Sequence, residues 1–320
     1  MTINAWIIAL NPQNPVALEL QRTLVEQGIH AEIKPAVDGR QQMPSLQGRE
    51  QLSQRKALIY RKAPLTSAEV GCYLSHYRLI QQAWDQGLSH ICLFEDDVVA
   101  ESGLGDLLRG IVALDDSAHL VRLMSLKIRK RKIVQDLPGD YTLVRPLRGA
   151  LGTQGYVVNR TGMKKILDFG ATIYLPIDKL YDNFFLYDLN CFSVEPHAVY
   201  EIVRPTSVKK AGEKPKLDAP LWLAFHCYKV YRSICRAYYR LKHQTTSVLL
   251  HAPGRILPAQ KTDTHSGQDP THQNVIIGLS DRCAPLLQRS SASPAHARHN
   301  SCAKDAGVTH GGDGTTHLHR

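Results

Sequence analysis

The segment Ile91-Cys-Leu-Phe-Glu-Asp-Asp97 passes directly from four apolar side chains to three acids. Its apolar part predicts a short buried strand. The acids Glu95, Asp96 and Asp97 then stand where the backbone leaves the core, at the carboxyl end of that strand, which is the edge where open α/β sheets bind ligands. Clustered carboxylates repel one another, and a hard divalent cation such as Mg²⁺ or Mn²⁺ relieves the repulsion. On spacing alone, a turn with acids exposed to water is the alternative.

A β-α-β pattern precedes this strand. The apolar run Ala5–Leu10 predicts a buried parallel strand, apolar residues at helical spacing follow it, and residues 31–35 predict a second strand. Further along, Thr66 and Glu69 have the spacing of a capping box, which predicts a helix over residues 67–84 that leads into the acidic strand. We therefore expect an α/β fold.

Composition excludes several classes of protein. The chain has 320 residues, of which 43% are hydrophobic and 21% charged, as in ordinary globular proteins rather than disordered or collagenous ones. Seven cysteines without a Cys-x-x-Cys pair favour neither a disulfide framework nor a zinc ribbon, so we expect a reducing, cytoplasmic location. The longest apolar run at the start is far shorter than a membrane span, and we expect neither a signal peptide nor a transmembrane helix.

The positive charge is concentrated in one segment. The net charge of +10 divides into +1 over residues 1–200, +7 over residues 201–243 and +2 over residues 244–320. A nucleic-acid enzyme more often carries positive charge across a whole reading surface. We therefore expect no nucleic-acid partner, and instead an anionic surface that is contacted at one place, with membrane lipid as the obvious candidate.

Residues 221–243 predict a basic amphipathic helix. On a helical wheel the basic side chains fall on one side and the apolar ones on the other, and Trp222 and several tyrosines suit a membrane interface. One hypothesis is peripheral attachment to the inner face of the cytoplasmic membrane, where a lipid-linked acceptor would be. The alternative is an ordinary helix that packs its apolar side on the rest of the protein.

Five short motifs together resemble a known family. In order and spacing they are similar to the family 25 glycosyltransferases of lipooligosaccharide biosynthesis, over about residues 3–205. The motifs are Ala36-Val-Asp-Gly39, Leu65-Thr-Ser-Ala-Glu-Val-Gly-Cys-Tyr-Leu-Ser-His76, Leu93-Phe-Glu-Asp-Asp-Val98, Gly152-Thr-Gln-Gly-Tyr-Val-Val158 and Pro176-Ile-Asp178. The resemblance implies a GT-A-type, Rossmann-like nucleotide-sugar-binding domain, a UDP-hexose donor that is usually UDP-galactose, and transfer with inversion.

The same resemblance implies roles for individual residues. The Glu-Asp-Asp word is similar to the family's Asp-x-Asp metal motif, so Glu95 and Asp97 are the expected metal ligands. Alternate residues of an extended segment point to opposite sides, so Asp96 is expected to face away from them and to contact the ribose or the sugar. Asp178 is the candidate base that deprotonates the acceptor hydroxyl. Its alternative role is the N-cap of a helix that begins at Lys179.

Three residues of the helix over 67–84 are further candidates for donor binding. They are His76, Glu69 and Ser75. For His76 a buried structural role is nearly as common as a ligand role. Capping explains Glu69 without any ligand. Cys72, on the same helix, is interpreted as a small buried residue.

These patterns divide the chain into three parts. We expect a GT-A-like glycosyltransferase domain over residues 1–205, a basic linker and amphipathic helix over residues 206–243, and a low-complexity, disordered tail over residues 244–320. The expected function is metal-assisted transfer of a hexose, galactose first, from a UDP-sugar to a lipooligosaccharide, lipopolysaccharide-core or similar acceptor. A metal-dependent phosphohydrolase acting on a similar nucleotide-sugar substrate is the alternative, and a non-catalytic carbohydrate- or membrane-binding protein ranks third.

Overall fold

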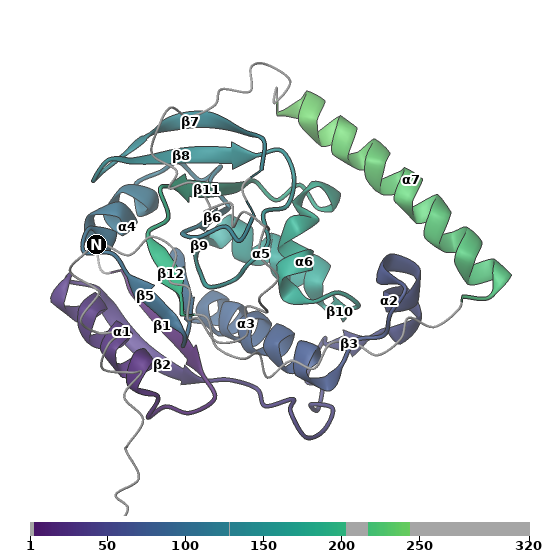
Figure 1. Cartoon of the computed structure of the whole chain (residues 1–320), viewed down its shortest axis with the longest axis horizontal. Helices are drawn as coiled ribbons and strands as arrows, with labels where there is room; N and C mark the ends of the chain where they lie inside the picture. The colour runs from purple at the N-terminus through teal and green to yellow at the C-terminus, as the bar shows by residue number, and fades with distance from the viewer. Residues whose placement is uncertain (1–2, 128, 203–216, 244–320) are drawn as a thin grey trace, which may run out of the picture. The chain divides into compact units, whose positions relative to one another are not determined.

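A mixed eight-stranded sheet forms the centre of the fold. We describe it from a computed structural model, in which residues 3–127, 129–202 and 217–243 are described (Figure 1). In spatial order the strands are β2 (His30–Pro35), β1 (Asn4–Ala9), β4 (His90–Glu95), β9 (Gly155–Asn159), β6 (Leu120–Arg122), β11 (Cys191–Glu195), β8 (Tyr141–Pro146) and β7 (Arg131–Leu137). β2, β1 and β4 are parallel, and β9 runs antiparallel to both β4 and β6. The expected α/β class is confirmed.

The expected β-α-β opening is confirmed. Helix α1 (Pro15–Glu26) connects β1 to β2, and the side chain of Asn14 caps it by accepting a hydrogen bond from Val16 N–H. Helix α3 (Ser67–Asp85) begins with the expected capping box, in which Thr66 and Glu69 satisfy each other's backbone N–H groups. α3 then leads through a short turn into β4, whose carboxyl end is Glu95.

The sheet separates two hydrophobic cores. Successive strand residues point to opposite faces, so Trp6 and Leu93 join one core while Ile7 and Phe94 join the other. The first core is covered by α3, α5 (Arg160–Gly170) and α6 (Ile177–Asp182), and the second by α1 and α4 (Leu104–Val112). Burial on both faces explains why the central strands read as continuous apolar runs.

Short elements complete the edge around the acids. β5 (Val98–Ala100) pairs antiparallel with β12 (Val199–Glu201), which returns residue 201 to the acidic turn. β3 (Gln51–Leu52) pairs with β10 (Thr172–Ile173), and α2 (Gln54–Arg61) follows β3. A 3₁₀ turn, η1 (Phe184–Leu186), follows α6. These elements place segments from distant parts of the chain beside the end of β4.

The loop after β2 crosses α3 with backbone against backbone. A Cβ atom on Gly39 would lie 2.0 Å from the carbonyl oxygen of Ser67, and one on Gly71 would lie 2.7 Å from that of Val37. No side chain fits at either position, which explains why glycine stands at both. The contact fixes the first turns of α3, on which several candidate site residues lie.

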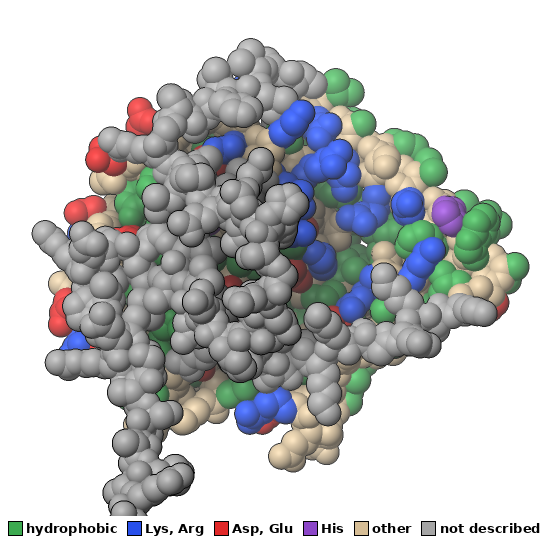
Figure 2. Space-filling view, in the orientation of Figure 1, with side chains coloured by type: hydrophobic (Ala, Val, Ile, Leu, Met, Phe, Trp, Pro, Cys, Tyr) green, Lys and Arg blue, Asp and Glu red, His purple; other side chains and the backbone are tan. Residues whose placement is uncertain are grey.

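The last described helix, α7 (Ala219–Lys242), packs with its basic side inward. Asp218 caps its N-terminus, and Tyr239, 4% exposed, donates a hydrogen bond to the carbonyl oxygen of Leu189. The alternative expectation, that the apolar side packs on the domain, is wrong. Instead that side is exposed (Figure 2), with relative exposures of 52–68%. It consists of Trp222, Leu223, Val230, Tyr231, Ile234, Tyr238 and Leu241.

None of the helices in the described ranges is both long and apolar enough to cross a membrane. The expected low-complexity tail over residues 244–320 lies outside the described residues, as does most of the expected linker.

Candidate active site

The three acids lie at the end of β4, as expected. Glu95 is the last residue of the strand, and Asp96 and Asp97 form the turn into β5. All three are partly buried, so the alternative of a fully solvated turn is wrong. The backbone turns at Asp96, which sends its side chain towards the start of α1. There Asn14 Nδ2 donates to Asp96 Oδ2 at 2.9 Å and to the Asp96 carbonyl oxygen at 3.2 Å.

Glu95 is held in the ionised form. The hydroxyl of Thr153 donates a hydrogen bond to Glu95 Oε1, and His76 Nε2 lies 3.6 Å from the same oxygen. Burial favours the neutral acid, but the hydrogen bonds from His76 and Thr153 and the charge of His76 outweigh it and hold the pKa of Glu95 below its usual value.

His76 is a buried support of this carboxylate. Its side chain is 1% exposed, and its Nδ1 lies 2.9 Å from the hydroxyl of Tyr156, which is 2.8 Å from the hydroxyl of Tyr181. The imidazole therefore joins Glu95 to a chain of two buried tyrosines and does not line the pocket described below. Direct contact of His76 with a donor stays a prediction.

Asp97 lies in the most unfavourable electrostatic position of the three. Burial, together with the charges of Glu95, Glu201 and Asp96, raises the pKa of Asp97 to about 7. Its Oδ1 is buried and has no hydrogen-bond partner among the described residues. A buried carboxylate oxygen without a partner, near other carboxylates, calls for a cation.

Glu201 is a member of this cluster that the sequence pattern did not reveal. It lies at the end of β12 and accepts a hydrogen bond from Gln154 Nε2 at 2.9 Å. Burial and the charge of Glu95 raise the pKa of Glu201. Only the pairing of β12 with β5 brings it to the turn, and no local motif surrounds it.

The donor set fits Mg²⁺ or Mn²⁺ with two protein ligands. The described part of the chain contains no group of three or more His, Cys, Asp or Glu side chains arranged to hold a metal ion. Mg²⁺ commonly binds through one or two carboxylates and takes its remaining ligands from water and substrate phosphates. Asp97, with Glu95 or Glu201 beside it, matches that pattern.

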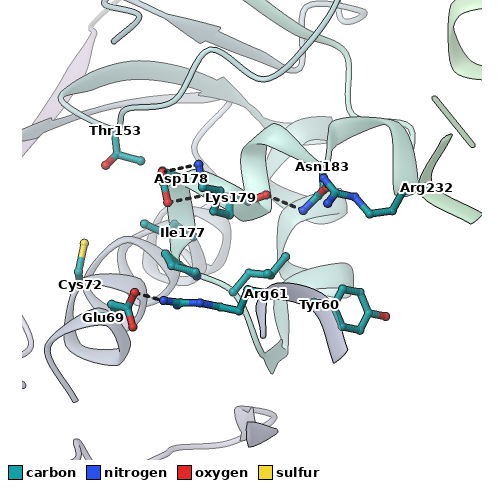
Figure 3. A pocket seen from close by; sticks show the side chains of 12 residues that line it. Tyr60, Arg61, Glu69, Cys72, Thr153, Ile177, Asp178, Lys179, Asn183 and Arg232 are labelled. Atoms are coloured by element: carbon teal, nitrogen blue, oxygen red, sulfur yellow. Dashed lines mark hydrogen bonds and ion pairs between the residues drawn. The ribbon is translucent and has the colours of Figure 1, made fainter. Parts of the chain in front are cut away.

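A pocket of about 580 Å³ opens next to this cluster. Residues from α2, α3, α6 and α7 meet around it (Figure 3). Its lining is Tyr60, Arg61, Glu69, Cys72, Thr153, Leu175, Pro176, Ile177, Asp178, Lys179, Asn183 and Arg232. Thr153 connects the two parts of the site, because it lines the pocket and also donates to Glu95.

Asp178 lines the pocket from the first turn of α6. The cap position of α6 is Pro176, so the alternative of Asp178 as N-cap is wrong. Its Oδ1 accepts a hydrogen bond from Lys179 N–H at 2.8 Å, and its Oδ2 lies 3.6 Å from Lys179 Nζ. Burial is the main cause that raises the pKa of Asp178; the charge of Asp182 adds to this effect and that of Lys179 opposes it. A carboxylate with a raised pKa at a pocket wall suits proton transfer.

The other candidates on α3 have different surroundings. Glu69 completes the capping box and forms a salt bridge with Arg61 at 2.8 Å, although it also lines the pocket. Ser75 is 4% exposed, donates to the carbonyl oxygen of Gly71 and accepts from Val37 N–H, so it does not reach the pocket. Cys72 is exposed on the pocket wall, and the expectation that it is a small buried residue is wrong.

A buried ion pair positions the loop that carries Thr153. Arg122, 2% exposed, donates to Asp182 Oδ1 at 2.9 Å, and the same oxygen accepts from Leu151 N–H at 3.2 Å. A Cβ on Gly149 would lie 2.1 Å from Asp182 Cγ, so the loop passes directly over this carboxylate. The pair therefore fixes the backbone of the segment before β9 and, with it, the hydroxyl that contacts Glu95.

A family model described as "Glycosyltransferase family 25 (LPS biosynthesis protein)" matches residues 3–181. Procollagen galactosyltransferase 2 of Homo sapiens is 31% identical over 209 residues, which are 56% of this chain and 32% of that protein. The lacto-N-neotetraose biosynthesis glycosyltransferase LgtE of Neisseria gonorrhoeae is 32% identical over 118 residues, 34% of this chain and 41% of that protein. The matched region thus spans less than half the length of either relative.

Similar solved structures include two glycosyltransferases. The enzyme involved in glycosylation of the major capsid of PBCV-1 gives a TM-score of 0.29 at 10% identity and covers 53% of this chain and 65% of its own. GlyE of Streptococcus pneumoniae TIGR4 gives 0.33 at 9% identity, with 76% and 64% covered. At these scores the likeness carries no argument about the site.

Proposed function

The chain belongs to glycosyltransferase family 25, and from this membership we propose that it is an inverting hexosyltransferase that uses a UDP-sugar donor and a glycan acceptor. The GT-A assignment rests on the same membership. One observation supports the proposal above the others. Asp97, whose buried Oδ1 has no hydrogen-bond partner among the described residues, lies at the carboxyl end of β4, where the carboxylate cluster adjoins a pocket that contains Asp178.

The acidic turn serves the donor in this proposal. Asp97 holds the divalent cation, with Glu95 or Glu201 as the second carboxylate. When bound, Mg²⁺ or Mn²⁺ stabilises the negative charge that develops on the departing diphosphate. Thr153 and His76 keep Glu95 ionised and oriented, because both hold the same oxygen. Asn14 holds Asp96 at the start of α1, and in this proposal Asp96 contacts the donor's ribose.

Asp178 is the general base in this proposal. Inversion requires a base on the acceptor side of the sugar, opposite the leaving group. Asp178 removes the proton of the acceptor hydroxyl as that oxygen forms the new bond to the sugar, and the bond from the sugar to the diphosphate breaks. Its raised pKa makes it a better proton acceptor than an ordinary carboxylate, and Lys179 stabilises its ionised form before the reaction.

The names of the relatives support galactose as the transferred sugar. Four of the proteins that match this chain are called procollagen galactosyltransferases, and LgtE is named for lacto-N-neotetraose biosynthesis. We propose UDP-galactose as the donor and a lipooligosaccharide or lipopolysaccharide-core glycan as the acceptor.

The test is UDP release from a panel of UDP-sugars with Mn²⁺, with and without an oligosaccharide acceptor. We expect release to depend on both the metal and the acceptor. Asp178→Asn should lower kcat by about 10²-fold to 10⁴-fold and leave UDP-sugar binding unchanged, as for loss of a general base. Asp168→Asn is the matched control, because Asp168 is exposed and lies outside the pocket. Release that needs no acceptor would indicate a hydrolase, and full activity of Asp178→Asn would exclude it as the base.

We also propose that the exposed apolar side of α7 lies on the cytoplasmic surface of a membrane. The helix carries five basic residues and no acidic one, and Trp222, Tyr231 and Tyr238 are exposed among its aliphatic residues. Such helices insert their apolar side at the boundary between headgroups and acyl chains, and each cation near anionic lipid adds about 1 kcal/mol.

Co-sedimentation with phosphatidylglycerol vesicles tests this attachment. Leu223→Ser with Ile234→Ser should lower the bound fraction strongly, because both side chains are more than half exposed on the apolar side. The control is Leu18→Ser, an exposed leucine on α1. Equal binding of the double variant and the wild type would exclude the proposal.

A further inference from the structure

The inner side of α7 carries a row of arginines at the edge of the pocket. Arg232, Arg236 and Arg240 follow one another at intervals of four residues, so they share one side of the helix. The loop after β8 contacts the same row, because Arg240 donates to the carbonyl oxygen of Leu147, the residue before Arg148, at 3.4 Å. Burial, followed by the charges of Arg232, Arg148 and Arg240, lowers the pKa of Arg236. Figure 2 shows Lys and Arg side chains gathered along this side of α7.

Within the described part of the chain, the positive charges of Arg232 and Arg236 are not paired with acids. No carboxylate of the described residues lies within 4.0 Å of Arg232 or Arg236. Arg232 donates instead to the neutral amide oxygen of Asn183 at 2.6 Å, and the guanidinium of Arg236 lies 4.7 Å from the centre of the Phe185 ring. The Nε atoms of both arginines are buried without a hydrogen-bond partner among the described residues.

This arrangement differs from an ordinary structural use of arginine. Guanidinium groups that hold a fold together are usually paired with carboxylates, as Arg122 is with Asp182 in this protein. Arg232 and Arg236 place like charges side by side with buried donors, which costs free energy unless an anion joins them. Several guanidinium groups together present the planar forks that phosphate and carboxylate oxygens accept.

The row of arginines lies at the end of the pocket away from the acidic turn, which is the acceptor side in the proposed function. In Figure 3 Thr153 and Arg232 lie on opposite sides of the pocket, with Asp178 and Lys179 between them. Thr153 marks the side of the acidic turn, which is the donor side in the proposed function, whereas Arg232 marks the far side. An anion held by the row therefore lies beyond the proposed base, seen from the donor.

We propose that Arg232 and Arg236, with Arg148 beside them, form a subsite for an anionic group, a phosphate or a carboxylate, carried by the glycan acceptor. The acceptor assignment rests on the proposed function. The same chemistry is also present in the donor's diphosphate, and the experiment below separates the two sources. A neutral glycan would leave Arg232 and Arg236 without an anion, so the enzyme prefers charged acceptors over neutral acceptors of the same sugar.

The first measurement is a titration of the full chain with inorganic phosphate at low salt and saturating UDP. Binding is monitored by ³¹P NMR. We expect saturable binding that weakens about tenfold or more in Arg236→Gln, the loss typical of a hydrogen bond to a charged group. Lys229→Gln removes the same charge from the exposed side of α7 and should bind phosphate as the wild type does. Arg148 is exposed, so Arg148→Gln provides a second variant that leaves the packing of α7 unchanged.

Two results would overturn the proposal. Loss of phosphate binding when UDP is saturating would assign the anion to the donor site, and unchanged binding in both arginine variants would remove the row from any anion site.

The second measurement compares transfer to an acceptor sugar and to its phosphorylated form. We expect the ratio of their kcat/KM values to fall about tenfold or more in Arg236→Gln, with the KM for the UDP-sugar unchanged. An unchanged ratio would overturn the acceptor assignment. If the wild type transfers to no acceptor but phosphate binding still depends on Arg236, the proposed function fails and the anion subsite stands.

Discussion

Replacing Asp97 by asparagine should stabilise the metal-free protein at alkaline pH. The pKa of Asp97 rises from an ordinary value of 3.8 to about 7, chiefly through burial and then through the charge of Glu95. Because the folded pKa is the higher one, the folded state binds the proton more tightly than the unfolded state. The penalty is therefore absent below about pH 4, grows as the pH rises and is complete above about pH 7.

The size of the effect follows from the same values. A rise from 3.8 to about 7 corresponds to about 4 kcal/mol when the carboxylate is fully ionised. Water reaches part of the turn, so about half of this, roughly 2 kcal/mol, is the expected gain of Asp97→Asn at pH 8. For a protein of 320 residues the gain raises Tm by about 3 °C. At pH 5 about a third of the gain should remain.

Thermal unfolding in EDTA at pH 5 and pH 8 measures the stability gain of Asp97→Asn. Asp96→Asn is the matched control, because the change in charge is the same one residue away and its amide oxygen still accepts from Asn14; its gain should be less than half as large. Added Mn²⁺ should raise the Tm of the wild type at pH 8 and reduce its difference from Asp97→Asn. The reasoning is refuted if Asp97→Asn is no more stable than the wild type at pH 8, or if its gain is the same at both pH values.

Three further predictions concern the surroundings of the site. Gly39→Ala should lower stability by about 2 kcal/mol or more, since the new Cβ meets the Ser67 carbonyl at 2.0 Å, and a Tm equal to that of Gly103→Ala, where the nearest atom is 3.9 Å away, would contradict this. Thr153→Val removes a hydrogen bond that lowers the pKa of Glu95, so the acidic limb of the pH–rate profile should move to higher pH, and an unmoved limb would mean that Glu95 is not required as an anion. Tyr239→Phe should cost about 1–3 kcal/mol in urea unfolding, because the acceptor Leu189 loses its buried donor, and no change would show that the hydroxyl is replaced by water.

The parts of the fold with a regular hydrophobic pattern could be predicted from sequence. β1 and β4 are buried on both faces, so their apolar runs are unbroken, and the capping box of α3 is a local signal confined to Thr66 and Glu69. The acidic turn could be placed from the same pattern, because three acids directly after a buried strand mark the point where the backbone leaves the core. The two strands, the capping box and the position of the acidic turn are therefore confirmed.

The parts that depend on contacts between distant segments could not be predicted. Glu201 joins the acidic turn only through strand pairing, and Cys72 occupies what reads as a core position although the pocket lies against it. A helical wheel divides α7 into two sides but does not say which one packs. The choice depends on long-range contacts, such as the Tyr228 ring 3.7 Å from that of Tyr60 and Arg236 over Phe185.

The two-sided character of α7 has a thermodynamic consequence. Its outer side is the proposed lipid contact, while Arg232 on its inner side forms part of the pocket wall. If lipid binding shifts this helix, the free energy of occupancy in the pocket changes with it, and linkage requires the reverse effect to be equal. An occupied pocket would then alter the protein's affinity for the bilayer by the same factor by which the bilayer alters its affinity for the occupant.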